Sequence, residues 1–245
     1  MTVAAAAPHL LLGRDIRVQL RRIGQEQQPL LIVDAVLADP DAMVDAARAA
    51  AFYAPPHTHY PGLNAPLPES YYRTVVTALR GPIEAAFGLS REAYLKYFGF
   101  FALATVGAAD ATPVQKIPHH DSPDPDRLAM VHYLCRGAYG GTGFFRHRAT
   151  GFESIDGDRH AGYVAIAQSE LVQSELVRSE PGRASYADAH TPGYALIHQV
   201  ECVFNRLILY RNHVLHSALL GPKAGSADPG DGRLTANGFI EAVKP

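Results

Sequence analysis

The residues best suited to chemistry are two histidines and an aspartate that lie far apart in the chain. His119 and Asp121 stand in the run Pro-His-His-Asp, and His216 follows much later in Leu-His-Ser. Two neutral imidazoles and one carboxylate are the ligand set of mononuclear non-haem iron(II) sites, and this set leaves coordination positions open. A 2-oxo acid can chelate through some of the open positions, and dioxygen can take another.

The spacing of these residues decides which of the histidines can share a metal. Side chains alternate along a strand, so His119 and Asp121 face one side while His120 faces the other. His213 and His216 compete as the third ligand, since residues three apart face opposite sides of one strand. We favour His216 because its neighbours are apolar and because it lies nearer the arginine described next. The alternative for each of these two histidines is a structural position in the core or at the surface, without a metal.

A possible co-substrate pocket follows in Gly-Arg-Leu-Thr. Arg233 is predicted to pair with the distal carboxylate of 2-oxoglutarate, because a guanidinium grips a carboxylate with two parallel hydrogen bonds. Tyr133 could add a phenolic hydrogen bond, and Thr235 shares a strand face with Arg233. The alternatives are a surface ion pair for Arg233 and a core aromatic for Tyr133.

Two further features lie on the predicted strand 142–147 and the turn before it. The run Gly-Gly-Thr-Gly-Phe (140–144) is either a plain hairpin turn, which we favour, or a rim where backbone passes close to the metal pocket. Arg146 and Arg148 end this strand and are candidates for gripping a substrate carboxylate. Solvated charges at a strand end are the alternative for both.

The first part of the chain, 1–93, is predicted to supply one strand and supporting helices. Residues 30–33 (Leu-Leu-Ile-Val) indicate a buried strand. Asp-Pro-Asp at 39–41 is typical of a helix start, and this helix is expected to end near residue 53. A Pro-, Gly- and His-rich loop is expected at 55–68, and a second helix at 69–87 with a break at Gly81-Pro82.

The second part, 94–245, is predicted to be the β core of the same single domain. Short strands separated by turn residues favour a sandwich, jelly roll or barrel. Residues 149–194 have no β pattern and are expected to form an inserted lid over the substrate. Within them, the stretch 168–180 (QSELVQSELVRSE), which contains a five-residue duplication, is expected to be an exposed or lid-like helix. The expected strands are 94–104, 115–119, 129–134, 142–147, 195–200, 206–210, 213–218 and 235–241.

Composition narrows the partners. A net charge of −2 and the lack of a basic patch argue against nucleic acid, and no run reaches the ~18 apolar residues of a membrane span. Cys135 and Cys202 lack CxxC spacing, so we expect no disulfide framework. Together with the absence of a signal-peptide pattern in residues 1–20, this predicts a cytoplasmic protein. A small molecule or peptide is the expected substrate, and no pattern indicates the oligomeric state.

The motifs together resemble those of iron(II)/2-oxoglutarate dioxygenases of the prolyl-hydroxylase type. The matching pieces span residues 94–241. More narrowly, the chain is similar to a bacterial family of uncharacterised proteins, DUF6445, within that superfamily. The pieces are Pro-His-His-Asp-Ser-Pro (118–123), Val-His-Tyr-Leu (131–134), Gly-Gly-Thr-Gly-Phe (140–144), Asn-Arg-Leu-Ile-Leu-Tyr-Arg (205–211), Leu-His-Ser (215–217) and Gly-Arg-Leu-Thr (232–235).

The resemblance implies a mainly β fold, a double-stranded β-helix (cupin-like jelly roll), with the N-terminal helices packed outside. It implies Fe(II) ligands at His119, Asp121 and His216, and 2-oxoglutarate contacts at Tyr133 and Arg233. One departure is the Pro/Gly/Asp-rich insertion 221–232, which lengthens the gap between His216 and Arg233.

The expected reaction couples O2 and 2-oxoglutarate to hydroxylation of an unactivated C–H bond, with release of succinate and CO2. The substrate would be a small amino-acid-like or peptidyl molecule. Asp121 is retained where a halogenase would have Ala or Gly, which favours hydroxylation or a related oxidation. The alternatives are a cupin-like metal- or ligand-binding protein without turnover and a zinc hydrolase, although the chain has no HExxH motif to supply a base.

Overall fold

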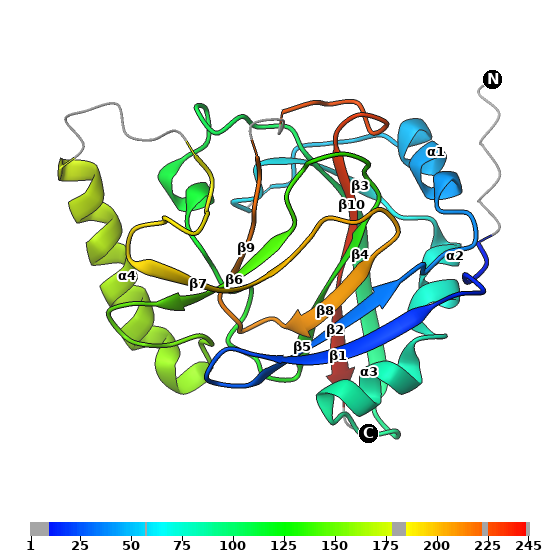
Figure 1. Cartoon of the computed structure of the whole chain (residues 1–245), viewed down its shortest axis with the longest axis horizontal. Helices are drawn as coiled ribbons and strands as arrows, with labels where there is room; N and C mark the ends of the chain where they lie inside the picture. Colours follow the sequence, from blue (N-terminus) through cyan, green and yellow to red (C-terminus); the bar gives the residue numbers. More distant parts are fainter. Residues whose placement is uncertain (1–9, 57, 178–184, 222–224, 244–245) are drawn as a thin grey trace.

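The chain forms two antiparallel β-sheets flanked by helices (Figure 1). The computed structural model describes residues 10–56, 58–177, 185–221 and 225–243. Within these ranges the larger sheet has seven strands in the order β1-β2-β8-β5-β10-β4-β3, and the smaller has three in the order β7-β6-β9. The protein is therefore mainly β, as the sequence predicts.

Ten strands and the helices follow one another along the described chain. The larger sheet contains β1 (Arg17–Ile23), β2 (Gln28–Asp34), β3 (Gly62–Pro66), β4 (Tyr94–Ala104), β5 (Arg127–Tyr133), β8 (Leu207–Arg211) and β10 (Arg233–Val243). The smaller contains β6 (Thr142–His147), β7 (Tyr194–Val200) and β9 (His216–Ala218). The helices are α1 (Asp41–Ala49), α2 (Glu69–Tyr71), the π-helical turn η1 (Tyr72–Val76), α3 (Arg80–Phe87), the 3-10 helix η2 (Pro113–Lys116) and α4 (Gly157–Val177).

The central strands of the larger sheet are apolar on both faces because both faces are covered. On β8, Leu207 and Leu209 join a core beneath the N-terminal helices, while Ile208 and Tyr210 join a second core that faces the smaller sheet. Alternation of side chains along a strand produces this division. Phe144 of β6 packs into the second core from the opposite side. The two sheets thus sandwich the second core between them.

The N-terminal helices cover the outer face of the larger sheet, as expected. Met43 of α1, Tyr71 of α2 and Ile83 of α3 are fully buried in the same core. Figure 1 shows α1, α2 and α3 on the opposite side of the molecule from α4. The first helix ends at Ala49, earlier than the expected residue 53.

Three expectations for the N-terminal part need correction. The second helix is interrupted by a turn at residues 77–79, and Pro82 instead lies in the first turn of α3, where its missing N–H breaks no helical bond. The loop expected at 55–68 contains edge strand β3, which pairs with β4. The amphipathic strand β1, exposed at six of its seven positions, was not predicted.

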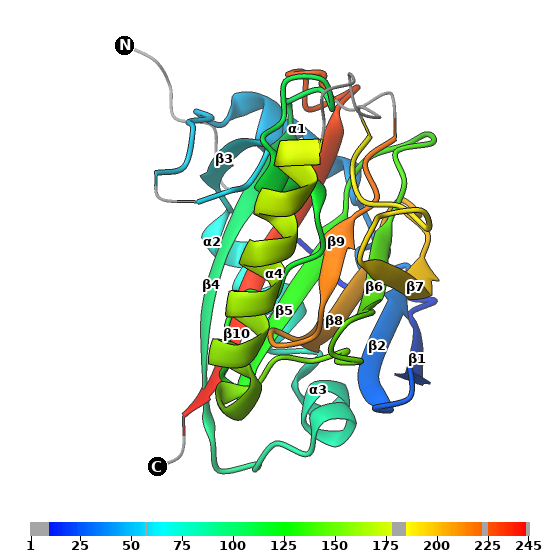
Figure 2. The same ribbon diagram turned by 90° about the vertical axis from the view of Figure 1, so that its left-hand side faces the viewer.

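The insertion 149–194 is dominated by α4, which packs on the outer face of the smaller sheet (Figure 2). Tyr163 of α4 joins Phe145 and Tyr194 in a third core, and the Tyr163 and Tyr194 hydroxyls lie 3.1 Å apart. Residues 178–184, which include the end of the expected exposed helix, lie outside the described residues. The described part of α4 therefore forms an outer layer of the fold.

The structure also tests the expectations about membrane spans and disulfides. No helix among the described residues is long and apolar enough to cross a membrane. Both cysteines are free thiols, with the Sγ atoms of Cys135 and Cys202 3.3 Å apart.

Candidate metal centre

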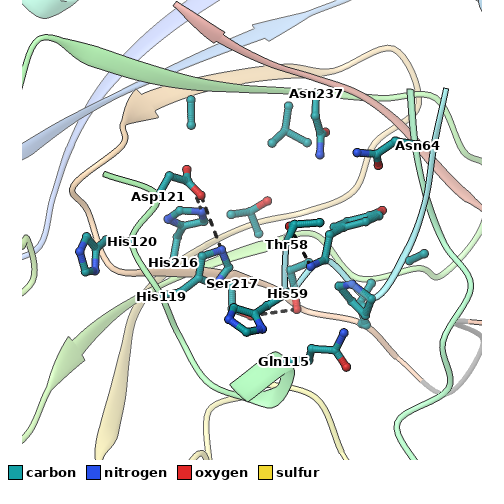
Figure 3. Close-up of a pocket in the computed structure, with 18 of the residues that line it drawn as sticks. Thr58, His59, Asn64, Gln115, His119, His120, Asp121, His216, Ser217 and Asn237 are labelled. Carbon is teal, nitrogen blue, oxygen red and sulfur yellow. Dashed lines mark hydrogen bonds and ion pairs between the residues drawn. The ribbon is translucent and has the colours of Figure 1, made fainter. Parts of the chain in front are cut away.

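His119, Asp121 and His216 converge at the inner edge of the smaller sheet (Figure 3). Their ligand atoms all lie within 4.8 Å of one another. The Asp121 carboxylate is 3.8 Å from Nε2 of His119 and 3.6 Å from Nε2 of His216. Among the described residues this is the one such group able to hold a metal ion. The arrangement offers two imidazoles and one carboxylate to a single ion and leaves the cavity side open.

Proline places His119 where it can meet His216. We predicted a strand at 115–119, but Pro113 opens the 3-10 helix η2 with a Thr112–Gln115 capping box. The residue before Pro118 must then be extended, since proline excludes the helical conformation there. After Pro118 the chain forms an isolated antiparallel β-bridge, in which His119 and His216 exchange both backbone hydrogen bonds, at 2.9 and 2.8 Å.

Hydrogen bonds fix the other two ligands. The N–H of Asp121 donates to the carbonyl of Asn212 at 2.9 Å, which holds the loop after the bridge. Nδ1 of His216 donates to the carbonyl of Val214 at 2.9 Å, so Nε2 keeps its lone pair toward Asp121. A backbone acceptor on the second ring nitrogen is the usual way in which a metal-binding histidine is oriented.

The surroundings of His119 favour its neutral form. Its side chain lines the cavity and is 53% exposed, and partial desolvation by the surrounding protein atoms lowers its pKa, with repulsion from His216 as the second cause. Because the ordinary value is near 6.5, the imidazole is deprotonated at neutral pH. A neutral imidazole is the form that coordinates a metal.

The neighbouring histidines lie apart from this group. His120 points away from Asp121 (Figure 3), and its Nε2 lies 3.1 Å from Nδ1 of His160 on α4. His213 is buried, and its Nδ1 has no hydrogen-bond partner among the described residues. Of the two competing histidines, the structure brings His216 and not His213 to the pair.

The three residues open into a cavity of about 450 Å³ that also contains Arg233. Arg233 begins β10, is 4% exposed, and has no acidic partner among the described residues. One NH2 group donates to the carbonyl of Gly141 at 3.2 Å, while Nε has no partner. A buried guanidinium with an unused donor favours an anionic ligand, because an uncompensated buried charge is costly.

The glycine run provides this contact and is more than a plain turn. Gly140 has a φ of +61°, and a Cβ there would lie 1.7 Å from the carbonyl oxygen of Leu219. A Cβ on Gly141 would lie 1.7 Å from the carbonyl oxygen of Val200. These glycines let the backbone pack closely against neighbouring segments. The run is not the hairpin that we favoured, because β5 and β6 lie in different sheets, and its Thr142 lines the cavity.

Tyr133 and Thr235 lie beside Arg233 but already have partners. They are directly opposite each other on β5 and β10. The Tyr133 hydroxyl is 2.7 Å from Oγ1 of Thr142, and the Thr235 hydroxyl donates to the carbonyl of Ala102 at 3.4 Å. Neither side chain lines the cavity, whereas Thr142 does. The structure thus places both beneath the arginine rather than at the cavity surface.

Arg146 and Arg148, the candidates for substrate binding, are outside the cavity lining. Arg146 forms an ion pair with the buried carboxylate of Glu153, and Arg148 donates to the carbonyl of Tyr194 at 2.9 Å. Both side chains have structural partners, which corrects their expected position at the mouth.

Sequence reasoning missed most of the polar residues that line the cavity, among them Tyr60, Asn64, Tyr210 and Asn237. The ring of Tyr210 lies 4.7 Å from that of His216. Tyr60 and Asn64 belong to the segment expected to be a loop, where the Pro/Gly spacing concealed β3. Asn237 could have been found, since it lies on the same face of β10 as Arg233 and Thr235.

Comparison with known proteins identifies the family. A model of the family described as "Family of unknown function (DUF6445)" matches residues 14–240, and the chain belongs to this family. No curated protein matches the chain. A solved structure similar to this chain is a prolyl-4-hydroxylase from Pseudomonas putida, with 16% sequence identity and a TM-score of 0.38, covering 83% of this chain and 99% of that one.

Proposed function

We propose that the protein is an iron(II)- and 2-oxoglutarate-dependent oxygenase that hydroxylates an unactivated C–H bond. The observation that carries the proposal is one cavity lined both by a His-Asp-His group and by a buried arginine without an acidic partner among the described residues. A metal site alone would need only the first of these features. A co-substrate that binds metal at one end and carries a free carboxylate at the other needs both.

The residues that line the cavity match both the metal ion and 2-oxoglutarate in charge and in hydrogen-bonding groups. The only carboxylate among the described residues that line the cavity is Asp121, which leaves the charge of a divalent ion partly uncompensated for an anionic chelator. Arg233 has an unpaired Nε beside a donating NH2 group, the geometry that accepts a carboxylate in two parallel hydrogen bonds. Tyr133 supports the guanidinium with its ring, 5.8 Å from Cζ.

The chain's own residues would bind and orient the metal and 2-oxoglutarate, and they would exclude water. His119, Asp121 and His216 would hold the metal, and Arg233 would fix the far carboxylate of 2-oxoglutarate. Iron and 2-oxoglutarate, when bound, supply the oxidising chemistry, with succinate and CO2 as products. Phe100 and Phe239 line the cavity and would keep the reacting C–H bond away from water.

The layered fold supports the same proposal. We interpret the two facing sheets as those of a double-stranded β-helix, with the metal group at the edge where β9 meets the residues after η2. The reciprocal bridge between His119 and His216 joins the two metal-binding segments, which supports a rigid site.

Anaerobic titration with iron(II) and 2-oxoglutarate tests the proposal. We expect a weak visible charge-transfer band that requires both additions, and succinate formation once air is admitted. A protein that binds iron without the band, and forms no succinate, would instead be a metal-binding protein without turnover. Tight zinc binding with hydrolysis of an ester probe would favour the hydrolase alternative.

A further inference from the structure

Two side-chain amides face the metal cavity from the larger sheet (Figure 3). Asn64 lies on β3 and is only 7% exposed, and Asn237 lies on β10. The Oδ1 atom of each is buried and has no hydrogen-bond partner among the described residues. Leaving a buried acceptor unpaired costs about 1–3 kcal/mol, so two incompletely paired amides at one cavity indicate a polar ligand.

The register of the sheet places the two amides around a common space. Strand β4 lies between β3 and β10, with Asn64 opposite Ala102 and Asn237 opposite Phe100. Neighbouring strands are about 4.8 Å apart and each residue rises about 3.4 Å, so the two asparagine backbones, two strands apart and offset by two residues, are separated by roughly 12 Å. A planar amide group fits between the ends of two such side chains. Each carboxamide offers both a donor and an acceptor, which complements the N–H and C=O of another amide.

The charges of the cavity exclude a zwitterion at this place. Among the described residues that line it, the only Asp, Glu, Lys or Arg side chains are Asp121 and Arg233. Under the proposed function, the metal takes the first and 2-oxoglutarate the second. A free amino acid would then bring a carboxylate and an ammonium with no ionic partner, at a large desolvation cost. A neutral amide avoids this cost.

An aromatic strip leads from the same space toward solvent. Phe239 and Phe100 line the cavity with ring centroids 6.4 Å apart, and Phe98 lies 5.7 Å from Phe100 and is 65% exposed. These rings offer apolar contact to a group attached to the amide. The uncharged polar end and the aromatic strip are therefore adjacent parts of one surface.

We propose that Asn64 and Asn237 form a subsite for an uncharged amide of the substrate, with an apolar group beside it on Phe100 and Phe239. This inference rests on the proposed function, because it assigns Arg233 to the co-substrate. It selects capped or internal amides as substrates and excludes free amino acids.

Matched small molecules test the inference. The probes are the N-acetyl methylamides of leucine, phenylalanine and proline, each compared with its free amino acid. Binding is measured by saturation-transfer NMR on protein loaded with zinc(II) and 2-oxoglutarate, which needs no turnover. We expect at least one capped amide to bind at least about tenfold more tightly than its free amino acid. Equal or tighter binding of the free amino acids, or no binding of any capped amide, would overturn the proposal.

Variants of nearly the same shape identify the residues. Asn64→Leu and Asn237→Leu each remove the donor and acceptor, and each should weaken binding of the capped amide by about tenfold, the effect of one lost hydrogen bond. Gln173→Leu, which removes an exposed carboxamide on α4, is the matched control and should not change binding. Melting curves check that each variant is folded.

The iron–2-oxoglutarate band separates the two ways of failing. If wild-type protein gives no band, the proposed function fails. If the band persists in Asn64→Leu and Asn237→Leu while the capped amide binds as tightly as to wild type, the subsite is wrong and the proposed function stands.

Discussion

The three side chains of the metal group act as a unit, so each should be indispensable. Replacing His119, Asp121 or His216 by Ala removes one of three ligands. Loss of a residue that merely supports a ligand typically costs 10–100-fold in metal affinity, and loss of a ligand should cost more than about 100-fold. Iron(II) affinity measured by calorimetry checks this result. His120→Ala is the control, because His120 points to His160 and should keep its metal affinity within about threefold.

Arg233 is expected to act on the co-substrate and not on the metal. Arg233→Ala should weaken 2-oxoglutarate binding by ~2–5 kcal/mol, the range for truncating one partner of a buried charge pair. Titration of the visible band measures this affinity, and iron(II) affinity should stay the same. Arg148→Ala, which removes an arginine outside the cavity, is the control. Wild-type 2-oxoglutarate affinity in Arg233→Ala would assign the arginine to another ligand.

Among individual residues, the sequence predicted the metal-binding side chains better than the side chains around them. The i and i+2 spacing of His119 and Asp121 requires one side of an extended segment, and the structure has that arrangement. Arg146 could not be placed correctly, because its partner Glu153 lies beyond a turn whose path the sequence does not specify. Asn64 was missed because Gly62 and Pro66 bound its short strand and are typical of a loop.

Among the elements, two strands were predicted to the residue, whereas β10 runs over Arg233–Val243 and not only over the expected 235–241. Tyr94–Ala104 and Thr142–His147 have the predicted bounds. The strand expected at 115–119 is wrong because Pro113 favours the first turn of a 3-10 helix, and Gln115 completes its cap. Edge strand β3 contains Gly62 and Pro66, which are turn residues elsewhere and are tolerated at a sheet edge.

Helix α4 should depend on contacts with the smaller sheet for its position. Nε2 of the fully buried His147 lies 2.9 Å from the carboxylate of Glu170, and Tyr163 packs in the core beside it. Glu170→Ala should lower the free energy of unfolding by about 1–3 kcal/mol, because it leaves a buried ring nitrogen unpaired. Tyr163→Ala should cost about 3–5 kcal/mol.

Urea unfolding measures both of these effects. Val172→Ala is the control on the same helix, since Val172 is 54% exposed, and it should change stability by less than ~0.5 kcal/mol. If Glu170→Ala and Tyr163→Ala were equally neutral, α4 would not be docked as the structure has it. Neutral effects of both substitutions would instead fit a helix that docks only when substrate binds, which is the lid that the sequence predicted.

For the whole molecule, the sequence predicted the class and the order of the layers but not their shape. Gly/Pro-separated strands favoured a sandwich, jelly roll or barrel, and the resemblance implied N-terminal helices packed outside; the structure has two antiparallel sheets with those helices against the larger one. The unequal division into seven and three strands could not be predicted, because the hairpin of β1 and β2 joins the larger sheet through the pairing of β2 with β8, which is distant in sequence. Such pairings depend on tertiary contacts that no local pattern encodes.

One buried histidine connects these layers and should make stability depend on pH. Oδ1 of Asn205 accepts from the N–H of Leu37 at 3.0 Å, which identifies it as the acceptor for Nε2 of His132 at 3.2 Å. Nδ1 of His132 is then free to accept from the Tyr71 hydroxyl at 3.0 Å. His132 is thus fully bonded as a neutral ring between β5, α2 and the loop before β8.

Burial lowers the pKa of His132 to about 4, whereas an unfolded histidine titrates near 6.5. Between these values the unfolded chain takes up a proton that the folded chain refuses, so stability falls as pH drops, by about 1.4 kcal/mol per unit. His132→Gln can keep both hydrogen bonds and has no proton to bind. The stability advantage of wild type over this variant should therefore shrink by about 2 kcal/mol between pH 7 and pH 5, measured by urea unfolding. His190→Gln, at an exposed position, should show no such change. A pH-independent difference for His132→Gln would mean that the pKa of His132 is the same in the folded and unfolded chains.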